Sequence, residues 1–480
     1  MNQKTFSKYF IKFSICLFFC VPPCVFAQPV KLKGTWEGKI NAGVDLRVVF
    51  HFAIDSTGNL SGTTDSPDQG VKGVACSDIN VAEDSVHLAV KAFGATYNGK
   101  LINDTTITGQ LTQGRSIDLI LKKVLKVSTY NRPQTPSPPF SYTSEEVEFE
   151  NVDSSLHYGA TLTIPPGKGP FPAVLLITGS GAQNRDEEIL EHKPFLVIAD
   201  ALTKRGILVM RVDDRGVGKS SGSFKNASSA DFAADVNTSL NYLISRPETD
   251  HKHLGMIGHS EGGMIAPMVA VKRKDINFII LLAGPGEKGL KLMEEQNVAL
   301  LRSAGFSQEA AEDYRSLYHS LATGILKSKN NDEAKKNAYA AVDDWKKITP
   351  EKIVVTTTGI HDDSTEKKFV DLTTEAFNSA WFRYFLQFDP TQYLSKLTCK
   401  VLALNGEKDV QVQSSTNLAG IRSALAKSKS LAYEAKEIPG LNHLFQHCKR
   451  CTVAEYGQLE ETFAPEVLHL IGDWILKNVK

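Results

Sequence analysis

The chain has 480 residues, which is too many for one ordinary domain, so two or three domains are expected. Apolar residues make up 42% and charged residues 22%, a balance typical of a globular protein with a sizeable core. Lys plus Arg and Asp plus Glu both total 54, and the resulting net charge of zero argues against nucleic acid or an anionic membrane surface as a partner.

The N-terminus has the pattern of a secretory signal peptide over residues 1–27. Three lysines precede an apolar run at residues 13–19, and Ala27 offers the small residue that cleavage requires, which predicts cleavage before Gln28. A membrane-spanning helix needs about 20 apolar residues, so this run is too short, and no later segment is long and apolar enough. We therefore expect an exported protein without a membrane span, in a periplasm or outside the cell.

Cysteine placement bears on this expectation. Neither Cys20 nor Cys24 has a convincing lipobox, so we do not favour a lipoprotein. In the oxidising compartment that export implies, Cys448 and Cys451 are a candidate disulfide. We favour this over a zinc site built from the two cysteines and nearby histidines, because no second cysteine pair has zinc-ligand spacing.

Residues 28–125 have the character of a β-rich domain. The segment 46–52 mixes β-branched and aromatic residues, and the segments 85–90 and 116–121 alternate between apolar and polar residues. Short strands between regular turn signals predict a small antiparallel barrel or sandwich. The G-x-W motif that ends at Trp36 is similar to the start of lipocalin-like barrels. We interpret Trp36 as a core residue rather than a ligand-binding aromatic residue.

A proline-rich linker is predicted at residues 126–142. Residues 133–139 contain four prolines, which exclude a helix or a central strand and favour a stiff, extended segment. We expect it to separate the β-rich domain from a second domain over residues 143–480.

In the second domain the apolar pattern changes. Continuous apolar runs alternate with helical stretches, which predicts an α/β fold with a mostly parallel sheet covered on both faces. These runs lie at 173–177, 207–212, 254–257, 278–283 and 401–404. The pattern is interrupted at about 287–387 by a region rich in Lys, Glu, Ala and Leu, which we interpret as a helical lid over the carboxyl edge of the sheet.

The motif G-x-S-x-G at residues 258–262 identifies Ser260 as the candidate nucleophile. It follows the apolar run 254–257 and precedes a second apolar stretch that is typical of a helix. A tight turn between strand and helix exposes a serine hydroxyl at the edge of the sheet, and the flanking glycines allow close backbone approach.

A nucleophilic serine needs a base, and the base needs an orienting acid. Asp409 follows the predicted strand 401–404, and His443 follows the next predicted strand. Both are therefore expected at the carboxyl edge with Ser260. Glu407 is the alternative acid and His447 the alternative base.

The oxyanion formed during the reaction needs backbone N–H donors. We expect one from Glu261, directly after the nucleophile, and a second from Ser180, with Gly181 as its substitute.

Taken together, residues 143–480 resemble the α/β-hydrolase superfamily, in its secreted bacterial esterase and serine-aminopeptidase-like branch. The matching segments, in chain order, are 179–181 with 184–187, 213–220, 258–263, 405–409 and 442–443. The resemblance implies acyl transfer through an acyl-serine, with no cofactor and no metal. Thr178 stands where this superfamily often has histidine, so the resemblance specifies the second oxyanion donor less well than the triad.

Arg185, Asp186, Glu187 and His192 lie just beyond the predicted oxyanion loop. Two interpretations remain open for them, namely side chains that reach the substrate pocket and a solvated loop.

We expect a secreted serine hydrolase that cleaves carboxylic esters of small substrates. A serine aminopeptidase or small-peptide hydrolase, acting on short peptides, is the second enzymatic interpretation. A catalytically inert binding protein is the alternative of a different class. The sequence carries no signal for the oligomeric state.

Overall fold

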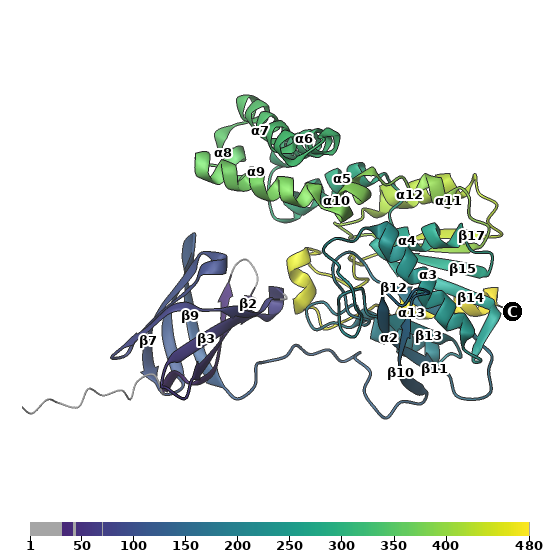
Figure 1. Cartoon of the computed structure of the whole chain (residues 1–480), viewed down its shortest axis with the longest axis horizontal. Helices are drawn as coiled ribbons and strands as arrows, with labels where there is room; N and C mark the ends of the chain where they lie inside the picture. The colour runs from purple at the N-terminus through teal and green to yellow at the C-terminus, as the bar shows by residue number, and fades with distance from the viewer. Residues whose placement is uncertain (1–30, 42–44, 70, 480) are drawn as a thin grey trace, which may run out of the picture. The chain divides into compact units, whose positions relative to one another are not determined.

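The computed structural model describes residues 31–41, 45–69 and 71–479 (Figure 1). The predicted signal peptide lies outside the described residues. The chain divides into two compact units, with the boundary between Ser128 and Thr129. None of the described helices has both the length and the apolar character needed to cross a membrane.

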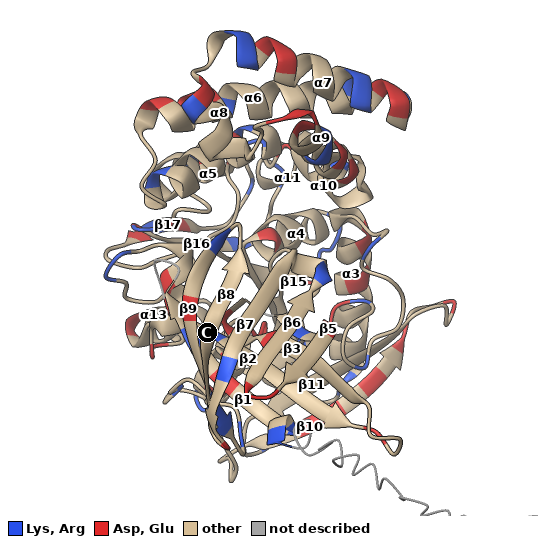
Figure 2. Ribbon diagram, turned by 90° about the vertical axis from the view of Figure 1, so that its left-hand side faces the viewer, with Lys and Arg blue, Asp and Glu red and all other residues tan. Residues whose placement is uncertain are grey.

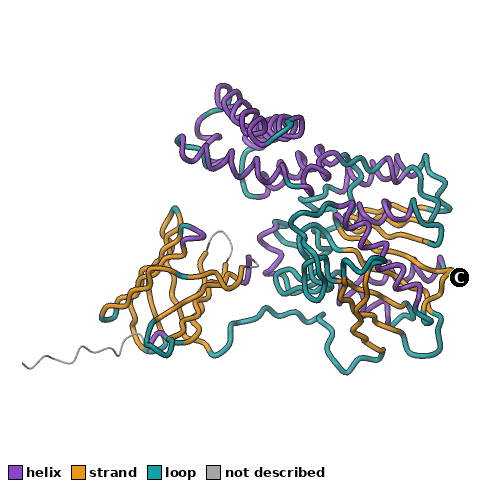
Figure 3. The backbone as a smooth tube through the Cα atoms, viewed as in Figure 1, coloured by secondary structure: helices purple, strands orange, loops and turns teal. Residues whose placement is uncertain are grey.

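The N-terminal unit has, in its described residues, a nine-stranded antiparallel sheet in the order β4-β3-β2-β1-β9-β8-β7-β6-β5. The strand bounds are β1 Gly34–Asn41, β2 Asp45–Ile54, β3 Leu60–Ser66, β4 Val71–Ala75, β5 Ser77–Ala82, β6 Ser85–Val90, β7 Ala95–Asn103, β8 Thr106–Gln113 and β9 Arg115–Val124. Two 3-10 turns lie at η1 Pro67–Gln69 and η2 Lys91–Phe93. Because β3 lies beside β5, the sheet is nearly closed, as its curvature in Figure 3 illustrates.

Alternate side chains of the strands form the core of this unit. In β6, Val86, Leu88 and Val90 are buried while the residues between them are less so, as the two-residue period of a strand requires. Trp36 is completely buried and its Nε1 donates a hydrogen bond to the carbonyl oxygen of Leu32 at 2.7 Å. The interpretation of Trp36 as a core residue is therefore confirmed.

The proline-rich segment has no regular secondary structure and lies against the C-terminal unit. Arg132 donates hydrogen bonds to the carbonyl oxygens of Leu190, Gly457 and Leu459 at 2.7–2.8 Å. Gln134 accepts from the amide of Phe463 at 3.0 Å. Part of the predicted linker thus acts as a strap on the second unit, an outcome that its composition did not indicate.

The C-terminal unit contains, among the described residues, an eight-stranded sheet in the order β10-β11-β13-β12-β14-β15-β16-β17. The pairs β10–β11 and β11–β13 are antiparallel and the other five are parallel, so the sheet is mixed. The strand bounds are β10 Thr143–Glu150, β11 His157–Ile164, β12 Phe171–Ile177, β13 Leu208–Val212, β14 Thr249–His259, β15 Ile276–Leu282, β16 Lys400–Gly406 and β17 Tyr433–Ile438.

Helices cover both faces of this sheet. Alternate residues of β12 point to opposite faces: Leu175 joins the core beneath α3, α4 and α12, whereas Leu176 joins the core beneath α2 and α13. These helices are α2 Pro194–Thr203, α3 Ser229–Ser245, α4 Glu261–Ala270, α12 Ser414–Leu425 and α13 Pro465–Asn478, and a 3-10 turn, η3 Val453–Gln458, precedes the last of them. Because both faces of the sheet are buried, successive residues of a strand are apolar, which explains the continuous apolar runs in the sequence.

A helical insertion separates β15 from β16. It consists of α5 Gly289–Ser303, α6 Gln308–Lys327, α7 Asn331–Ile348, α8 Glu351–Thr358, α9 Asp363–Asn378 and α10 Ala380–Gln387, followed by the short α11 Thr391–Leu394. Its helices enclose a core of their own that includes Leu317, Leu321 and Ile325. Basic and acidic residues alternate along α7, as Figure 2 shows. The insertion is therefore a small helical subdomain with a polar outer surface.

Candidate active site

Ser260 lies on a tight turn between β14 and α4. Its φ of +51° and ψ of −116° are unusual for a residue with a side chain. Backbone hydrogen bonds hold the turn, because the amide of Ser260 donates to the carbonyl of Leu282 at 2.8 Å and its carbonyl accepts from Gly263 at 2.9 Å. Such a conformation costs free energy and is typical of functional sites, where the surrounding structure maintains it.

Glycines around the serine allow this turn to pack. A Cβ added to Gly258 would lie 2.1 Å from the carbonyl oxygen of Gly262, and one added to Gly262 would lie 2.1 Å from that of Ile177. A Cβ on Gly263 would lie 2.7 Å from the Cα of Gly284. Since the obstructing atoms belong to the backbone, no side-chain movement can relieve these contacts. The motif therefore requires glycine at each of the three positions.

His443 and Asp409 form a buried pair beside the turn. His443 Nδ1 lies 2.8 Å from Asp409 Oδ2, and the side chains are 5% and 0% exposed. The other oxygen of Asp409 accepts the amides of Gln411 at 2.8 Å and Val412 at 2.9 Å. The carboxylate is thus fixed by its own loop, and it orients the imidazole by accepting a hydrogen bond from the Nδ1–H group.

The loop that carries His443 contacts the turn through the residue before Ser260. His259 Nε2 lies 3.0 Å from the carbonyl oxygen of His443, and the centroids of the two imidazole rings are 4.8 Å apart. In the described part of the chain, neither Ser260 Oγ nor His443 Nε2 makes a hydrogen bond. Hydrogen bonds of this kind are often long before substrate binds and tighten during the reaction.

The alternative acid and base have other partners. Glu407 lies 2.9 Å from Lys408 Nζ and accepts the amide of Gly440 at 3.0 Å. His447 is exposed, and its Nδ1 lies 3.0 Å from Glu461. Neither side chain joins the buried pair, so Asp409 and His443 are the better placed candidates.

Backbone amides lie close to the nucleophile. A Cβ added to Gly179, in the loop after β12, would lie 3.3 Å from Ser260 Cβ. The amides of Ser180 and Gly181, in the same loop, make no hydrogen bond within the described residues. Glu261 is the first residue of α4, where an amide has no carbonyl partner inside the helix. The loop that holds Ser180 and Gly181 thus approaches the serine at Gly179. The roles of Glu261, Ser180 and Gly181 as oxyanion donors stay predictions.

Comparisons with known proteins match parts of the chain. The model of the serine aminopeptidase family S33 matches residues 192–341, a range that contains Ser260 but neither Asp409 nor His443. Esterase EstD of Thermotoga maritima is 28% identical over 200 residues, which cover 42% of this chain and 46% of that protein.

The chain is therefore similar to known hydrolases over part of its length.

Other proteins are less similar to this chain. Acyl-coenzyme A thioesterase 3 of Mus musculus is 26% identical over 131 residues, which cover 26% of this chain and 26% of that protein. The chain thus spans less than half the length of both of these curated relatives. Among solved structures, an esterase of Pyrococcus furiosus aligns with 74% of this chain and 100% of its own at 14% identity and a TM-score of 0.43. The α/β-hydrolase GrgF of a Penicillium species aligns with 70% of this chain and 99% of its own at 15% identity and a TM-score of 0.41.

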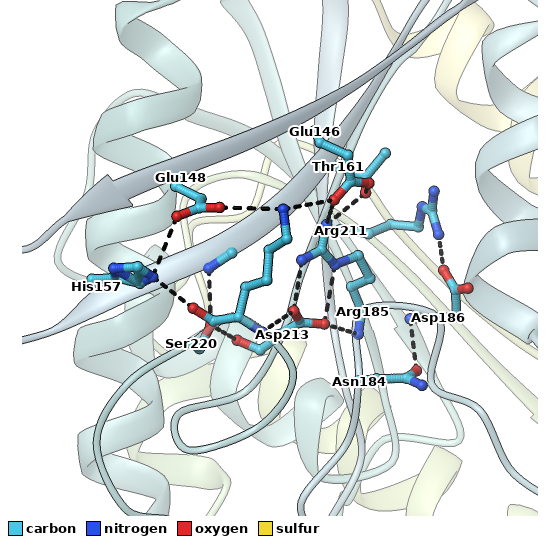
Figure 4. A network of polar contacts seen from close by, with 12 residues as sticks. Glu146, Glu148, His157, Thr161, Asn184, Arg185, Asp186, Arg211, Asp213 and Ser220 are labelled. Atoms are coloured by element: carbon cyan, nitrogen blue, oxygen red, sulfur yellow. Dashed lines mark hydrogen bonds and ion pairs between the residues drawn. The ribbon is translucent and has the colours of Figure 1, made fainter.

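Two of the predicted pocket residues join the loop after β12 to the sheet. Arg185 lies 2.6 Å from both Asp213 and Glu146, as Figure 4 shows. Asp186 pairs with the buried Arg211 (Figure 4). These contacts tie the loop after β12 to β10 and to the ends of β13. Both side chains are thereby engaged within the fold, and a role in the pocket stays a prediction.

The third predicted pocket residue is a buried histidine. His192 Nδ1 lies 2.9 Å from Thr462 Oγ1, and Nε2 lies 3.0 Å from the carbonyl oxygen of Tyr456. Burial lowers the pKa of His192 to about 4. A neutral imidazole that donates to a carbonyl and contacts a hydroxyl is satisfied by these partners, which indicates a structural side chain.

Two buried carboxyl groups lie next to the turn. The Glu261 carboxyl accepts from Ser229 Oγ at 2.6 Å and from Trp381 Nε1, on α10, at 2.9 Å. Burial raises the pKa of Glu261 to about 7. Burial also raises the pKa of Asp214 to about 7, although Thr178 donates to this carboxyl at 2.7 Å. Both groups line a cavity beside the turn and are partly protonated near neutral pH.

Sequence reasoning did not single out two residues that contact the site, namely His259 and Trp381. His259 lies inside the G-x-S-x-G motif, so its position was a signal. Trp381 lies in the insertion, where no local pattern pointed to the turn.

A disulfide joins Cys448 and Cys451 in the loop that follows His443. Among the described residues, no group of three or more His, Cys, Asp or Glu side chains is arranged to hold a metal ion.

Replacing Gly262 by Ala tests the packing of the turn. The new Cβ would meet the Ile177 carbonyl oxygen at 2.1 Å, so we expect the free energy of unfolding to fall by about 3 kcal/mol in urea denaturation. Gly324→Ala, in α6, is the control, since its Cβ would meet nothing closer than 3.4 Å. The control should be neutral or up to about 1 kcal/mol more stable. Equal stability of both variants would contradict this view of the motif.

Replacing Glu261 by Gln tests the buried carboxyl. Because the folded-state pKa is raised from 4.5 to about 7, this group contributes stability that is present below about pH 4.5 and is lost as pH rises through about 7. The glutamine does not titrate. Relative to Glu261→Gln, the wild-type free energy of unfolding should therefore fall by about 3 kcal/mol between about pH 4.5 and 8. Parallel pH dependences of the two proteins would contradict the shift.

Proposed function

We propose that this protein is an exported serine hydrolase that cleaves carboxylic esters of small substrates, with Ser260 as nucleophile, His443 as general base and Asp409 as the orienting acid. The observation that supports it most is the buried 2.8 Å contact between His443 Nδ1 and Asp409, beside the strained turn of Ser260. The alignment with Esterase EstD supports an ester as the substrate.

The proposed reaction proceeds in two stages. Since Nδ1 donates to Asp409, Nε2 of His443 is free to take the proton of Ser260 as Oγ attacks the carbonyl carbon. Amides of Glu261 and Ser180 stabilise the oxyanion. His443 then returns the proton to the leaving alcohol, and an acyl-serine remains. Water, activated by the same imidazole, releases the acid and restores the hydroxyl of Ser260.

We also propose that the helical insertion is a lid over this site. Trp381, on α10, donates to the carboxyl of Glu261, and the amide of Glu261 is a proposed oxyanion donor. A movement of α10 would therefore act directly on the residue after the nucleophile. Such an arrangement suits a lid that opens for substrate and closes for reaction.

Export is proposed on the basis of the signal peptide predicted at residues 1–27. The disulfide between Cys448 and Cys451 supports the same proposal, because such bonds persist in oxidising compartments.

An aminopeptidase is the second candidate function, and it is favoured by a specific observation. The carboxyl groups of Asp214, Glu187 and Glu261 surround the loop after β12, and a carboxylate near the nucleophile attracts a substrate ammonium group. The match to the serine aminopeptidase model also supports this alternative.

Substitutions at the proposed triad test the mechanism. Ser260→Ala should lower turnover of p-nitrophenyl esters by about four to six orders of magnitude, and Asp409→Asn by about 10⁴-fold, because each removes a group that acts only in the transition state. Glu407→Gln and His447→Ala are matched controls and should keep turnover close to wild type. Retention of more than about a few per cent of activity by Ser260→Ala would exclude this nucleophile.

A substrate panel separates ester from amide cleavage. We expect kcat/KM for p-nitrophenyl acetate and butyrate to exceed that for aminoacyl p-nitroanilides, measured by release of the coloured product. The reverse order would favour the aminopeptidase. Turnover of neither class by folded protein would favour a binding protein.

A further inference from the structure

A second imidazole–carboxylate pair lies behind the nucleophile. His259, the last residue of β14, is buried, and its Nδ1 lies 3.0 Å from Glu187 Oε1. The same Glu187 oxygen accepts the amide of Gly179 at 2.6 Å. On its other side, His259 Nε2 lies 3.0 Å from the carbonyl oxygen of His443. One pair of side chains therefore contacts the loop of the oxyanion donors, the strand end before Ser260 and the loop of the proposed base.

The two partners of His259 require a proton on each ring nitrogen. A carbonyl oxygen only accepts, so the contact with His443 requires a proton on Nε2. The ionised Glu187 oxygen likewise accepts, so Nδ1 must donate as well. A neutral imidazole has one N–H and satisfies only one of these contacts, whereas an imidazolium satisfies both. The pair is thus a buried ion pair rather than a neutral hydrogen bond.

The electrostatic surroundings agree with this assignment. Burial by itself lowers the pKa of His259, but the Glu187 carboxylate and the His443 carbonyl outweigh it and raise the pKa above its usual value. Asp409 acts in the same direction from the other side of His443. By contrast, burial and the nearby cation of Arg132 lower the pKa of His192 to about 4.

The backbone of Glu187 has an unfavourable conformation that the surrounding loop maintains. Its φ is +50°, a left-handed value uncommon for a residue with a side chain, and its amide donates to the carbonyl of Asn184 at 2.8 Å. The strain is consistent with a carboxylate that must reach both Gly179 and His259.

We propose that His259 and Glu187 are positioning residues, an imidazolium–carboxylate pair that fixes the base loop and the oxyanion loop relative to Ser260. This inference rests on the proposed function of Ser260 and His443. Neither side chain of the pair needs to touch substrate. Its effect is on geometry, and misplacement of a reacting group by about 1 Å costs about a hundred-fold in rate.

Kinetics of Glu187 variants test the positioning role. Glu187→Ala should lower kcat for p-nitrophenyl butyrate by about a hundred-fold with little change in KM, because the transition state depends on the geometry more than substrate binding does. Glu187→Gln still accepts from Gly179 but does not stabilise the imidazolium, so its kcat should lie between those of the Ala variant and the wild type.

A matched control separates positioning from the mere loss of a carboxylate that pairs with a histidine of β14. His253 Nδ1, also in β14, lies 2.6 Å from Asp250 and away from the proposed triad. Asp250→Ala should keep wild-type kcat. A folded Glu187→Ala with wild-type kcat, or a Glu187→Gln that equals the wild type, would overturn the proposal.

Nitrogen NMR of histidine-labelled wild-type protein tests the ion pair in the unaltered site. At about pH 8, well above the ordinary histidine pKa, both ring nitrogens of His259 should be protonated, with the signal assigned by its loss in His259→Gln. One protonated nitrogen would overturn the proposal. A protein that hydrolyses no ester and no amide would overturn the proposed function instead, and the spectrum would still decide whether the pair is ionised.

Discussion

The hydrogen bond between His443 and Asp409 is the interaction on which the site depends. It joins loops that follow the neighbouring strands β16 and β17, and both side chains are almost completely buried. In these buried surroundings the hydrogen bond is stronger than in water. Burial also removes water from the Asp409 carboxylate, and the amides of Gln411 and Val412 replace that water as hydrogen-bond donors. The parallel strands β14, β16 and β17 all end at the same edge of the sheet, which brings these loops to the turn of Ser260.

The sequence predicted those parts of the site that local patterns encode. Ser260 stands in a motif whose glycines are required by backbone contacts, and both Asp409 and His443 follow apolar strands at the edge of the sheet. The contacts of Glu187 with His259 were not predicted, because they join segments 72 residues apart by side chains that carry no periodic signal. The order of the strands likewise depends on pairing between distant segments, such as the antiparallel pairing of β11 with β13.

The strap formed by the proline-rich segment shows a further limit of composition. Its prolines correctly exclude helix and central strand, but they do not specify whether the segment is free or bound. Arg132 and Gln134 hold the segment in place through hydrogen bonds with backbone groups of the C-terminal unit. No pattern of side chains in the sequence reveals these contacts. The protonation of carboxyl groups near the turn cannot be predicted from composition either, since burial rather than residue type raises the pKa of Glu261 and Asp214.

The most direct test of the central claim is to locate a covalent adduct. Folded protein treated with a fluorophosphonate should gain one phosphonyl group, and mass spectrometry of its peptides should place that group on Ser260, since only a serine activated by a neighbouring imidazole reacts readily. Prior replacement of His443 by Ala should abolish the labelling. An adduct on another residue, or folded protein that remains unlabelled, would contradict the assignment of Ser260, His443 and Asp409 as a catalytic triad.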